Sequence, residues 1–199
     1  MAEPTITVVI ATISRPTLAR TLNSLVGQGW ITGDGVLVVG DGPQPVAQEL
    51  CSLFSPRLPI LYSQNPTRTG MWGHYARNWV LDQRHCTTDY LMALDDDDVY
   101  LPGAIETARR AFAECLQPRP HVFRMQNHPH VGTVWKEPQL VMGNLGTPVI
   151  AVPNNPSRLG RYTFHYGGDF DFCKSTCDYY ADGPVWREEV ICDVRPYRA

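Results

Sequence analysis

The sequence predicts an α/β fold in which a mostly parallel central sheet carries helices on both faces. Apolar, β-branched runs alternate with stretches of helical spacing through the first half of the chain. Continuous apolar runs of this kind are typical of parallel strands that are buried on both sides. Polar residues follow three of the runs directly, at Thr12, Asp41 and Asp95. Because such sheets bind ligands beyond the carboxyl ends of their strands, these positions indicate one binding edge.

The first half is expected to hold four strands, at Thr5–Thr12, Gly35–Gly40, Pro59–Ser63 and Tyr90–Leu94. Each is followed by a stretch whose apolar residues recur at helical spacing, at Leu18–Val26, Val46–Phe54, Met71–Arg84 and Ala104–Leu116. Pro16 suits a first helical turn, and Gly27 is a stop signal for the first helix. In the third helix, Trp72 is expected on the apolar side.

The second half changes character from Pro118 onward, because prolines become frequent and the strand-like runs become short. We expect a smaller mixed or antiparallel sheet here, packed beside the main one. Its strands are predicted at Val122–Gln126, Val131–Lys136, Gln139–Met142, Pro148–Val152 and Val190–Val194. No repeat or flexible linker divides the chain, so residues 1–199 are predicted to form one domain.

The composition is that of a globular protein, with 199 residues, 43% hydrophobic and 19% charged. A formal net charge of −3 gives no bias toward nucleic acid, which makes a nucleic-acid partner unlikely. No run approaches the ~20 apolar residues of a membrane span, and the N-terminus lacks the basic start of a secretory signal. We therefore expect a cytoplasmic protein without a membrane span.

The six cysteines are dispersed, which favours free thiols in a reducing compartment. Cys173, Cys177 and Cys192 could be combined into a zinc site, but their spacing is not that of the usual zinc knuckles. The zinc interpretation is therefore the weaker one.

Four consecutive aspartates, Asp95 to Asp98, stand directly behind the apolar run that ends at Leu94. Adjacent carboxylates repel one another, and burying them unpaired is costly. A divalent cation would compensate them, and hard oxygen ligands favour Mg²⁺, Mn²⁺ or Ca²⁺ over soft metals. The competing interpretation is a solvated acidic loop, which the adjoining core strand makes less attractive.

Taken together, four segments resemble the family 2 glycosyltransferases, which have the Rossmann-like GT-A fold. The segments are Thr12 with Ser14-Arg15-Pro16, Val38-Val39-Gly40-Asp41-Gly42, Gly70 with Ala76-Arg77-Asn78, and Tyr90 to Gly103 with its Asp-X-Asp pattern. They stand in the same order as in that family. In one departure, Gly40 replaces the first aspartate of the family's Val-Val-Asp-Asp-Gly segment.

The resemblance implies that residues 1–116 bind a nucleoside-diphosphate sugar and residues 117–199 bind the acceptor. The implied donor-binding residues are Thr12, Ser14, Arg15, Asp41, Gly70, Arg77, Asp95 and Asp96. Asp97 would ligate Mn²⁺ or Mg²⁺ with the help of Asp95, whereas Asp98 could cap the next helix. Arg77 could pair either with the aspartates or with the phosphates.

A fifth segment, Gly167 to Phe172, resembles the family's Gly-Glu-Asp-Tyr-Asp-Leu element, with Gly168 in place of the glutamate. The resemblance implies that Asp169 is the base for the acceptor hydroxyl, with Asp171 as the fallback, in a single inverting displacement. A carboxylate at a helix start would otherwise be a plain cap with a lowered pKa.

Further acceptor contacts are expected from residues around this segment: Tyr166, Gly168, Asp171 and His165. Histidines His128 and His130 and tryptophans Trp72, Trp135 and Trp186 are weaker candidates, because such residues are more often structural.

Two other functions remain open. A nucleotidyltransferase that makes a nucleotide-sugar commonly has a glycine-rich phosphate loop after its first strand, and Thr12–Pro16 has no glycine. A silent nucleotide- or carbohydrate-binding module would explain the glycines at positions 40 and 168. The preferred function is transfer from a UDP-sugar to a sugar, protein or small-molecule acceptor; the sequence indicates no oligomeric state.

Overall fold

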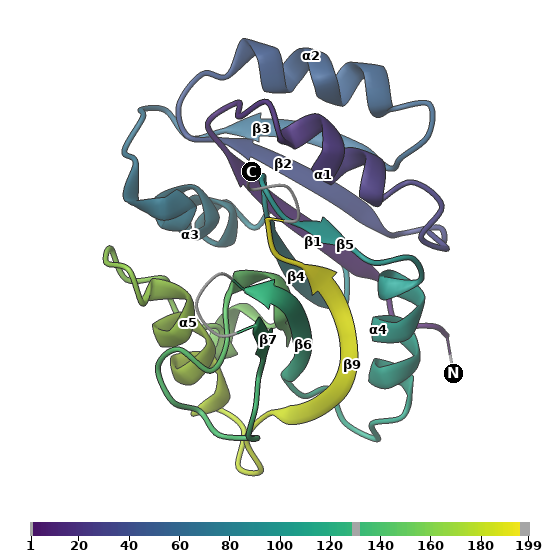
Figure 1. Cartoon of the computed structure of the whole chain (residues 1–199), viewed down its shortest axis with the longest axis vertical. Coiled ribbons are helices and arrows are strands. Elements are labelled where there is room, and N and C mark those ends of the chain that lie inside the picture. The colour runs from purple at the N-terminus through teal and green to yellow at the C-terminus, as the bar shows by residue number, and fades with distance from the viewer. Residues whose placement is uncertain (1, 129–131, 196–199) are drawn as a thin grey trace.

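The computed structural model describes residues 2–128 and 132–195, and they form one α/β fold around a nine-stranded sheet (Figure 1). The sheet order is β3-β2-β1-β4-β8-β6-β9-β5, with β7 paired to β6. The strands are β1 Ile6–Thr12, β2 Gly35–Gly40, β3 Ile60–Gln64, β4 Tyr90–Asp95, β5 Val99–Tyr100, β6 His121–His128, β7 Gly132–Val134, β8 Ile150–Pro153 and β9 Val185–Asp193. The helices are α1 Leu18–Ser24, α2 Pro45–Phe54, α3 His74–Gln83, α4 Ala104–Ala113 and α5 Gly168–Cys177.

Strands β3, β2, β1 and β4 are parallel, as the sequence predicts. Their register aligns Thr12 with Gly40 and Ala11 with Asp95. The residues that follow these strands therefore emerge at one edge of the sheet, which is where parallel α/β sheets bind ligands.

Helices cover both faces of this parallel part, because successive side chains of a strand point to opposite faces. Ile6, Val8 and Ile10 belong to the large core cluster that also contains residues of α1, α2 and α4. Val9 and Ala11 belong to a second, smaller cluster that contains residues of α3. The prediction of helices on both faces is confirmed.

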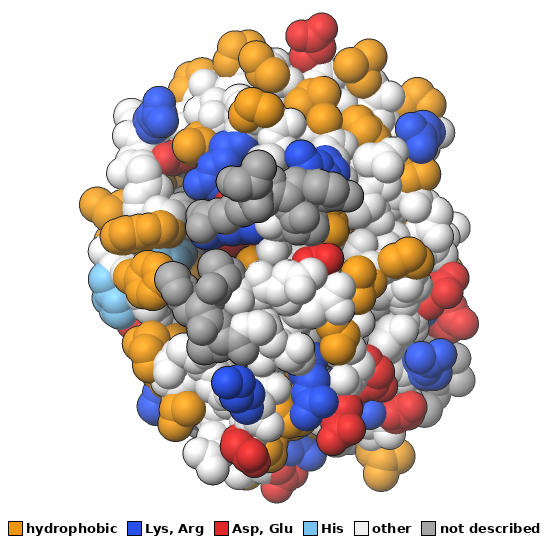
Figure 2. All heavy atoms as spheres, viewed as in Figure 1, with side chains coloured by type: hydrophobic (Ala, Val, Ile, Leu, Met, Phe, Trp, Pro, Cys, Tyr) orange, Lys and Arg blue, Asp and Glu red, His pale blue; other side chains and the backbone are white. Residues whose placement is uncertain are grey.

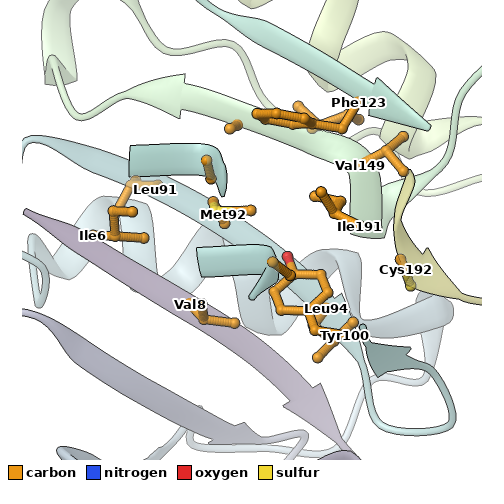
Figure 3. Packing of buried hydrophobic residues seen from close by; sticks show 14 of the residues in the cluster. Ile6, Val8, Leu91, Met92, Leu94, Tyr100, Phe123, Val149, Ile191 and Cys192 are labelled. Atoms are coloured by element: carbon orange, nitrogen blue, oxygen red, sulfur yellow. The ribbon is translucent and has the colours of Figure 1, made fainter. Parts of the chain in front are cut away.

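The strands of the second half continue the same sheet, since β8 pairs antiparallel with β4. Figure 3 shows Leu94 of the first half near Ile191 of the second half, and both belong to one core cluster with Val8 and Phe123. In Figure 1, α4 lies on one side of the long curved strand β9 and α5 lies beyond β6 on the other side.

The sheet curls, because its last strand β5 follows β4 after only residues 96–98. Three residues span about 10 Å at most, so the far edge of the sheet must return to β4. Tyr100 of β5 confirms this, because its hydroxyl donates to the Ala93 carbonyl oxygen of β4 at 3.2 Å. The acidic run thus lies in the short connection that closes the curl.

One predicted strand is wrong: residues 139–142 form turns and irregular chain. The backbone groups there bond to a side chain instead of to a neighbouring strand. Asn144 Nδ2 donates to the carbonyl oxygens of Glu137 and Gln139. Its Oδ1 accepts from the Lys136 backbone N–H.

Other predicted strands have different bounds, among them β6 and β8, which are shifted or extended by one or two residues. β9 begins at Val185 rather than Val190, because it pairs along most of β6. Of the strand predicted at residues 131–136, the structure has Gly132–Val134, and Val131 lies outside the described residues.

The predicted helix from Met71 is also corrected. A left-handed turn occupies residues 70–73, and α3 begins at His74. Trp72 does not lie on an apolar helix face and is 60% exposed. In the part of the chain that the structure describes, no helix is both long and apolar enough to cross a membrane.

Candidate active site

The four aspartates lie in the tight turn between β4 and β5, where the Asp98 backbone N–H donates to the Asp95 carbonyl oxygen at 3.2 Å. Their side chains separate toward different partners, so the run is not a solvated loop. Asp96 and Asp98 are buried, at 3% and 2% exposed. The four carboxylates therefore have different environments.

Asp96 is bound by the end of β1. The Thr12 hydroxyl donates to its Oδ2 at 2.6 Å, and Arg15 donates to its Oδ1 at 2.9 Å. Burial raises the pKa of Asp96, while Thr12 and Arg15 oppose that rise. Asp96 thus links the first and fourth strands at the binding edge.

Asp95, Asp97 and Asp98 direct carboxylate oxygens toward one another, all within 4.8 Å. The Oδ1 atom of Asp97 is buried and has no hydrogen-bond partner among the described residues. An unpaired buried carboxylate oxygen is costly, so this atom is suited to bind a cation. Three hard oxygen donors at this spacing fit Mg²⁺ or Mn²⁺.

Asp98 is the member of this cluster that the sequence did not predict as a ligand. It does not cap the next helix, which begins after Gly103; instead its Oδ1 accepts from the Arg195 backbone N–H at 2.9 Å. Burial, together with the charges of Asp95 and Asp97, raises the pKa of Asp98 to about 8. A bound divalent ion would favour its charged form.

Arg77 lies under the acidic run and is 2% exposed. Its Nη2 pairs with the Asp95 carboxylate, and its Nη1 donates to the Trp72 carbonyl oxygen at 3.2 Å. Burial alone would lower the pKa of Arg77, but the neighbouring Asp95 and Tyr162 raise it. Of the two roles left open for Arg77, the structure shows the pair with an aspartate.

Arg195 is a site residue that the sequence analysis missed. Its Nε lies 3.1 Å from Asp97 Oδ2, while its backbone binds Asp98. Arg15 approaches the same Asp97 oxygen at 3.2 Å. No spacing signal connects Arg195 with an acidic run about a hundred residues earlier; only the curl of the sheet brings them together.

The nucleotide-side residues line a cavity of about 450 Å³ at this edge, with Thr12, Arg15, Asp41 and Gly70 in its wall. Figure 2 shows some of the Lys and Arg side chains of the viewed face in its upper centre, near the carboxyl ends of β1 and β4 in Figure 1, and others along its lower part. Two predicted donor-binding residues lie outside this wall: Arg77, which is buried beside Asp95, and Ser14. The Ser14 hydroxyl accepts from the Ala47 backbone N–H at 3.3 Å, which ties the turn after β1 to α2.

Asp41 is 1% exposed and shapes the loop that faces it. Its Oδ1 accepts from both the backbone and the hydroxyl of Thr69, each at 2.9 Å, and its Oδ2 accepts from the Gly70 backbone N–H at 2.6 Å. Asn65 also donates to Asp41 Oδ1, at 3.2 Å. The carboxylate therefore holds the 65–70 loop against the end of β2.

The turn at residues 70–73 follows that loop, and all four of its residues have positive φ. Met71 and Trp72 have φ of 48° and 51°, which bulky side chains rarely adopt and which costs about 1–3 kcal/mol per residue. Gly73 is required, because a Cβ there would lie 2.7 Å from that of Ala11. Trp72 also lines the 450 Å³ cavity.

Asp169, in the first turn of α5, lines a second cavity of about 490 Å³. Its Oδ1 accepts from the Phe170 backbone N–H at 2.8 Å. Burial, together with the charge of Asp95, raises the pKa of Asp169 despite that hydrogen bond and the charge of Arg77. Burial thus outweighs the effect expected of a helix start, and the carboxylate is suited to accept a proton.

Asp171, the fallback base, has a different role. It accepts hydrogen bonds from the Thr163 hydroxyl and from His165 Nε2, the latter at 2.7 Å. The Thr163 hydrogen bond is the main reason why the pKa of Asp171 is lowered. Because its carboxylate binds its own loop, the geometry favours Asp169 as the base.

Gly168 is explained by its neighbours. A Cβ at this position would clash with the Thr163 carbonyl oxygen and with the His74 ring. His74 Nδ1 lies 2.8 Å from that same carbonyl oxygen. The segment before α5 therefore packs directly onto the start of α3, and no side chain fits at position 168.

The remaining candidates divide between site and core. Tyr166 and His128 line the 490 Å³ cavity. Trp135 is buried against Trp186 with ring centroids 5.2 Å apart, so this pair is structural. His130 lies outside the described residues.

In residues 2–128 and 132–195 the cysteines form no cluster with the geometry of a zinc site, and Asp95, Asp97 and Asp98 are the one group there whose ligand atoms lie close enough together to hold a metal ion. Cys173 and Cys177 lie together in the core, with Sγ atoms 4.0 Å apart. A larger hollow of about 1030 Å³, with Tyr179 in its wall, lies at the other end of β4 and contains none of the site residues above.

Comparisons with known proteins identify the family and the fold. Residues 7–151 match the family model described as glycosyl transferase family 2. No curated protein matches the chain in sequence.

Solved structures of glycosyltransferases share the fold at low sequence identity. TarS of S. aureus in complex with UDP-GlcNAc has a TM-score of 0.75 at 17% identity, over 98% of this chain and 59% of that one. The mannosyltransferase PcManGT from Pyrobaculum calidifontis, in complex with GDP-Man and Mn²⁺, has a TM-score of 0.73 at 17% identity, over 100% of this chain and 59% of that one. The chain spans 36% of the longer TarS structure, with a TM-score of 0.74 at 18% identity. The fold is GT-A, as predicted.

Proposed function

The chain belongs to glycosyl transferase family 2, and from this premise we propose that it transfers a sugar from a nucleoside-diphosphate sugar to an acceptor hydroxyl with the help of a divalent cation. One observation carries the proposal. The oxygen cluster of Asp95, Asp97 and Asp98, with its unpartnered Asp97 Oδ1, lies at the junction of two cavities. One cavity has the features of a nucleotide site and the other holds a carboxylate with a raised pKa.

In the first cavity, Arg15 and Arg195 place guanidinium groups beside the acidic cluster, where the diphosphate of the donor would lie. Asp95, Asp97 and Asp98 would hold Mn²⁺ or Mg²⁺, which when bound neutralises the negative charge that develops on the leaving diphosphate. Arg77 keeps Asp95 oriented from below. These side chains come from the segments after β1 and β9, from α3 and from the end of β4 and its connection to β5, so the site depends on the folded sheet.

In the second cavity, Asp169 accepts the proton of the acceptor hydroxyl as its oxygen attacks the anomeric carbon of the donor sugar. The bond between that carbon and the diphosphate oxygen breaks, and the nucleoside diphosphate leaves. A single displacement from the face opposite the leaving group inverts the anomeric configuration. The raised pKa of Asp169 supports this role, because a stronger base takes the proton more readily.

The base of the donor nucleotide is left to experiment, with uridine as the preferred choice. Similar structures are complexes with UDP-GlcNAc and with GDP-Man, so the fold accommodates either kind of donor. Asp41 and the 65–70 loop that it holds form the wall that would meet the base.

The test is a thermal-shift panel of UDP, GDP, dTDP and their sugars, first with Mn²⁺ and then with EDTA. Ligand binding raises the melting temperature by mass action, so one base should give a shift that EDTA removes. Asp169→Asn should keep this shift and lose transfer by about 100-fold or more. Asp82→Asn, which changes an exposed carboxylate paired with Arg161, is the matched control and should change neither.

The same panel separates the alternatives. A silent binding module would show the shift but no transfer in the unmodified protein. A nucleotidyltransferase would instead consume a nucleoside triphosphate and a sugar phosphate. Absence of a metal-dependent shift with every nucleotide would contradict the proposal.

A further inference from the structure

Contacts of the neighbouring backbone hold the Trp72 side chain in its exposed position. Gly70 before it is fixed to Asp41, and Gly73 after it packs against Ala11. Arg77 binds the Trp72 carbonyl oxygen at 3.2 Å. A left-handed backbone at a bulky residue is unfavourable, and such strain is usually found at functional positions. The surrounding contacts therefore hold an indole ring, 60% exposed, in a conformation that packing of the core does not require.

The position of Trp72 connects the two cavities of the site. Trp72, Asp95 and Arg195 line both the 450 Å³ cavity and the 490 Å³ cavity. A group held on the indole would thus lie between the acidic cluster and Asp169. This is where the two reacting partners of a sugar transfer must meet.

The second cavity presents another exposed aromatic ring. Tyr166 is 75% exposed and lines the cavity together with the partly exposed Met142 and the buried Met125. Flat apolar faces beside a carboxylate suit the C–H face and the hydroxyl edge of a pyranose ring.

His74 couples the two aromatic residues. Its ring lies 6.2 Å from that of Trp72 and stacks on Tyr162 at 5.6 Å. Its Nδ1 hydrogen-bonds the carbonyl oxygen of Thr163, in the segment that carries Tyr166. The turn at residues 70–73 and the segment before α5 are therefore positioned relative to each other, as a preformed binding cleft requires.

We propose that the acceptor is a carbohydrate and that Trp72 is the platform on which its pyranose ring stacks, with a hydroxyl directed to Asp169. The proposal rests on the transferase function above, and it names the class of acceptor. Trp72 is a specificity residue for the acceptor sugar, and Tyr166 supplies the outer wall of the same cleft.

The experiment measures sugar binding separately from nucleotide binding. Protein saturated with Mn²⁺ and the nucleoside diphosphate found in the thermal-shift panel is titrated with the methyl glycosides of glucose, galactose, mannose and N-acetylglucosamine, followed by saturation-transfer NMR. At least one glycoside should bind saturably. Trp72→Ala should weaken that binding by about 10-fold or more, whereas Trp72→Phe should stay within about 3-fold.

Two variants make the result specific. Trp72→Gly removes the ring and the backbone strain together, so it should lose sugar binding while the melting temperature stays the same or rises. Tyr179→Ala removes an equally exposed aromatic ring from the remote 1030 Å³ hollow and should leave sugar binding unchanged. Nucleoside diphosphate affinity should remain within about 2-fold in Tyr179→Ala, and the Trp72 variants are compared at nucleoside diphosphate concentrations that saturate each of them.

The proposal is overturned if none of the four glycosides binds the loaded protein, or if Trp72→Ala binds them like the unmodified protein. A fall in melting temperature for Trp72→Gly would show that the Trp72 ring stabilises the fold by packing, and this would also overturn the proposal. Failure of the transferase function would appear elsewhere, as loss of the metal-dependent nucleotide shift in the unmodified protein.

Discussion

Raising the pH of the metal-free protein from 6 to 8 should destabilise it, because Asp98 must then ionise inside the acidic cluster. Its pKa is raised from the ordinary value of 3.8 to about 8, first by burial and then by the charges of Asp95 and Asp97. The folded state thus binds a proton more tightly than the unfolded chain. Its stabilising effect is fully present below pH 3.8 and is lost as the pH rises through about 8. Over the interval from pH 6 to 8 the loss is about 2 kcal/mol.

The assay is thermal unfolding in EDTA across this pH range. For a domain of this size about 2 kcal/mol corresponds to roughly 4–8 °C in melting temperature. Asp98→Asn keeps the shape and can still accept from Arg195, so its profile should be flatter by about that amount. Mn²⁺ should stabilise the unmodified protein more at pH 8 than at pH 6, because metal and proton compete for one carboxylate. A melting temperature that stays constant or rises from pH 6 to 8 would refute the reasoning.

Three further substitutions test other parts of the site. Arg77→Met leaves Asp95 unpaired and should cost about 2–3 kcal/mol in denaturant unfolding, less than for a fully buried pair because the Asp95 side chain is 32% exposed; an unchanged midpoint would contradict the role of this pair. Asp97→Asn should reduce Mn²⁺ affinity in calorimetry and transfer by about 100-fold or more, and equal affinity in both proteins would exclude Asp97 as a ligand. Gly168→Ala adds a Cβ that clashes with the Thr163 carbonyl oxygen, so it should destabilise by about 1–3 kcal/mol and slow transfer more than it weakens nucleotide binding.

The fold could be predicted where local pattern and tertiary environment agree. β1, β2 and β4 are continuous apolar runs because each is covered on both faces, and the helices between them repeat at helical spacing. The second half could be predicted less well, because its pairings are long-range. The extent of β9 follows from its pairing with β6, about sixty-five residues earlier in the sequence. Near Asn144, the backbone hydrogen bonds are made by that one side chain instead of by a neighbouring strand.

The candidate site shows the same division. Asp41, Asp95, Asp97 and Asp169 stand at strand or helix ends in recognisable local segments, and the structure brings them to one edge. Arg195 has no local signal, because only the closing of the sheet between β4 and β5 places it beside Asp97.

Trp72 was mispredicted for a different reason. Its spacing fits an apolar helix stripe, but Gly70 and Gly73 on either side permit a left-handed turn. The contacts of that turn with Asp41 and Arg77 outweigh helix propensity. Two glycines three residues apart before a helix indicate such a turn, but here the apolar residues at helical spacing favoured the helix prediction.

The charges of the site explain why metal and nucleotide should bind together. Four carboxylates at Asp95–Asp98 face three guanidinium groups, those of Arg15, Arg77 and Arg195, which leaves one negative charge when all are ionised. Above about pH 8, where Asp98 is ionised, a nucleoside diphosphate alone would meet a site that repels it. A divalent ion on the free Asp97 Oδ1 reverses the sign to one positive charge, which then attracts the diphosphate. Arg77 is buried beneath Asp95 and holds the Asp95 carboxylate in place, so the change in the sign of the net charge needs no rearrangement of the sheet edge. Because the four carboxylates outnumber the three guanidinium groups, nucleotide affinity should depend on the metal. The comparison of thermal shifts with Mn²⁺ and with EDTA measures this dependence.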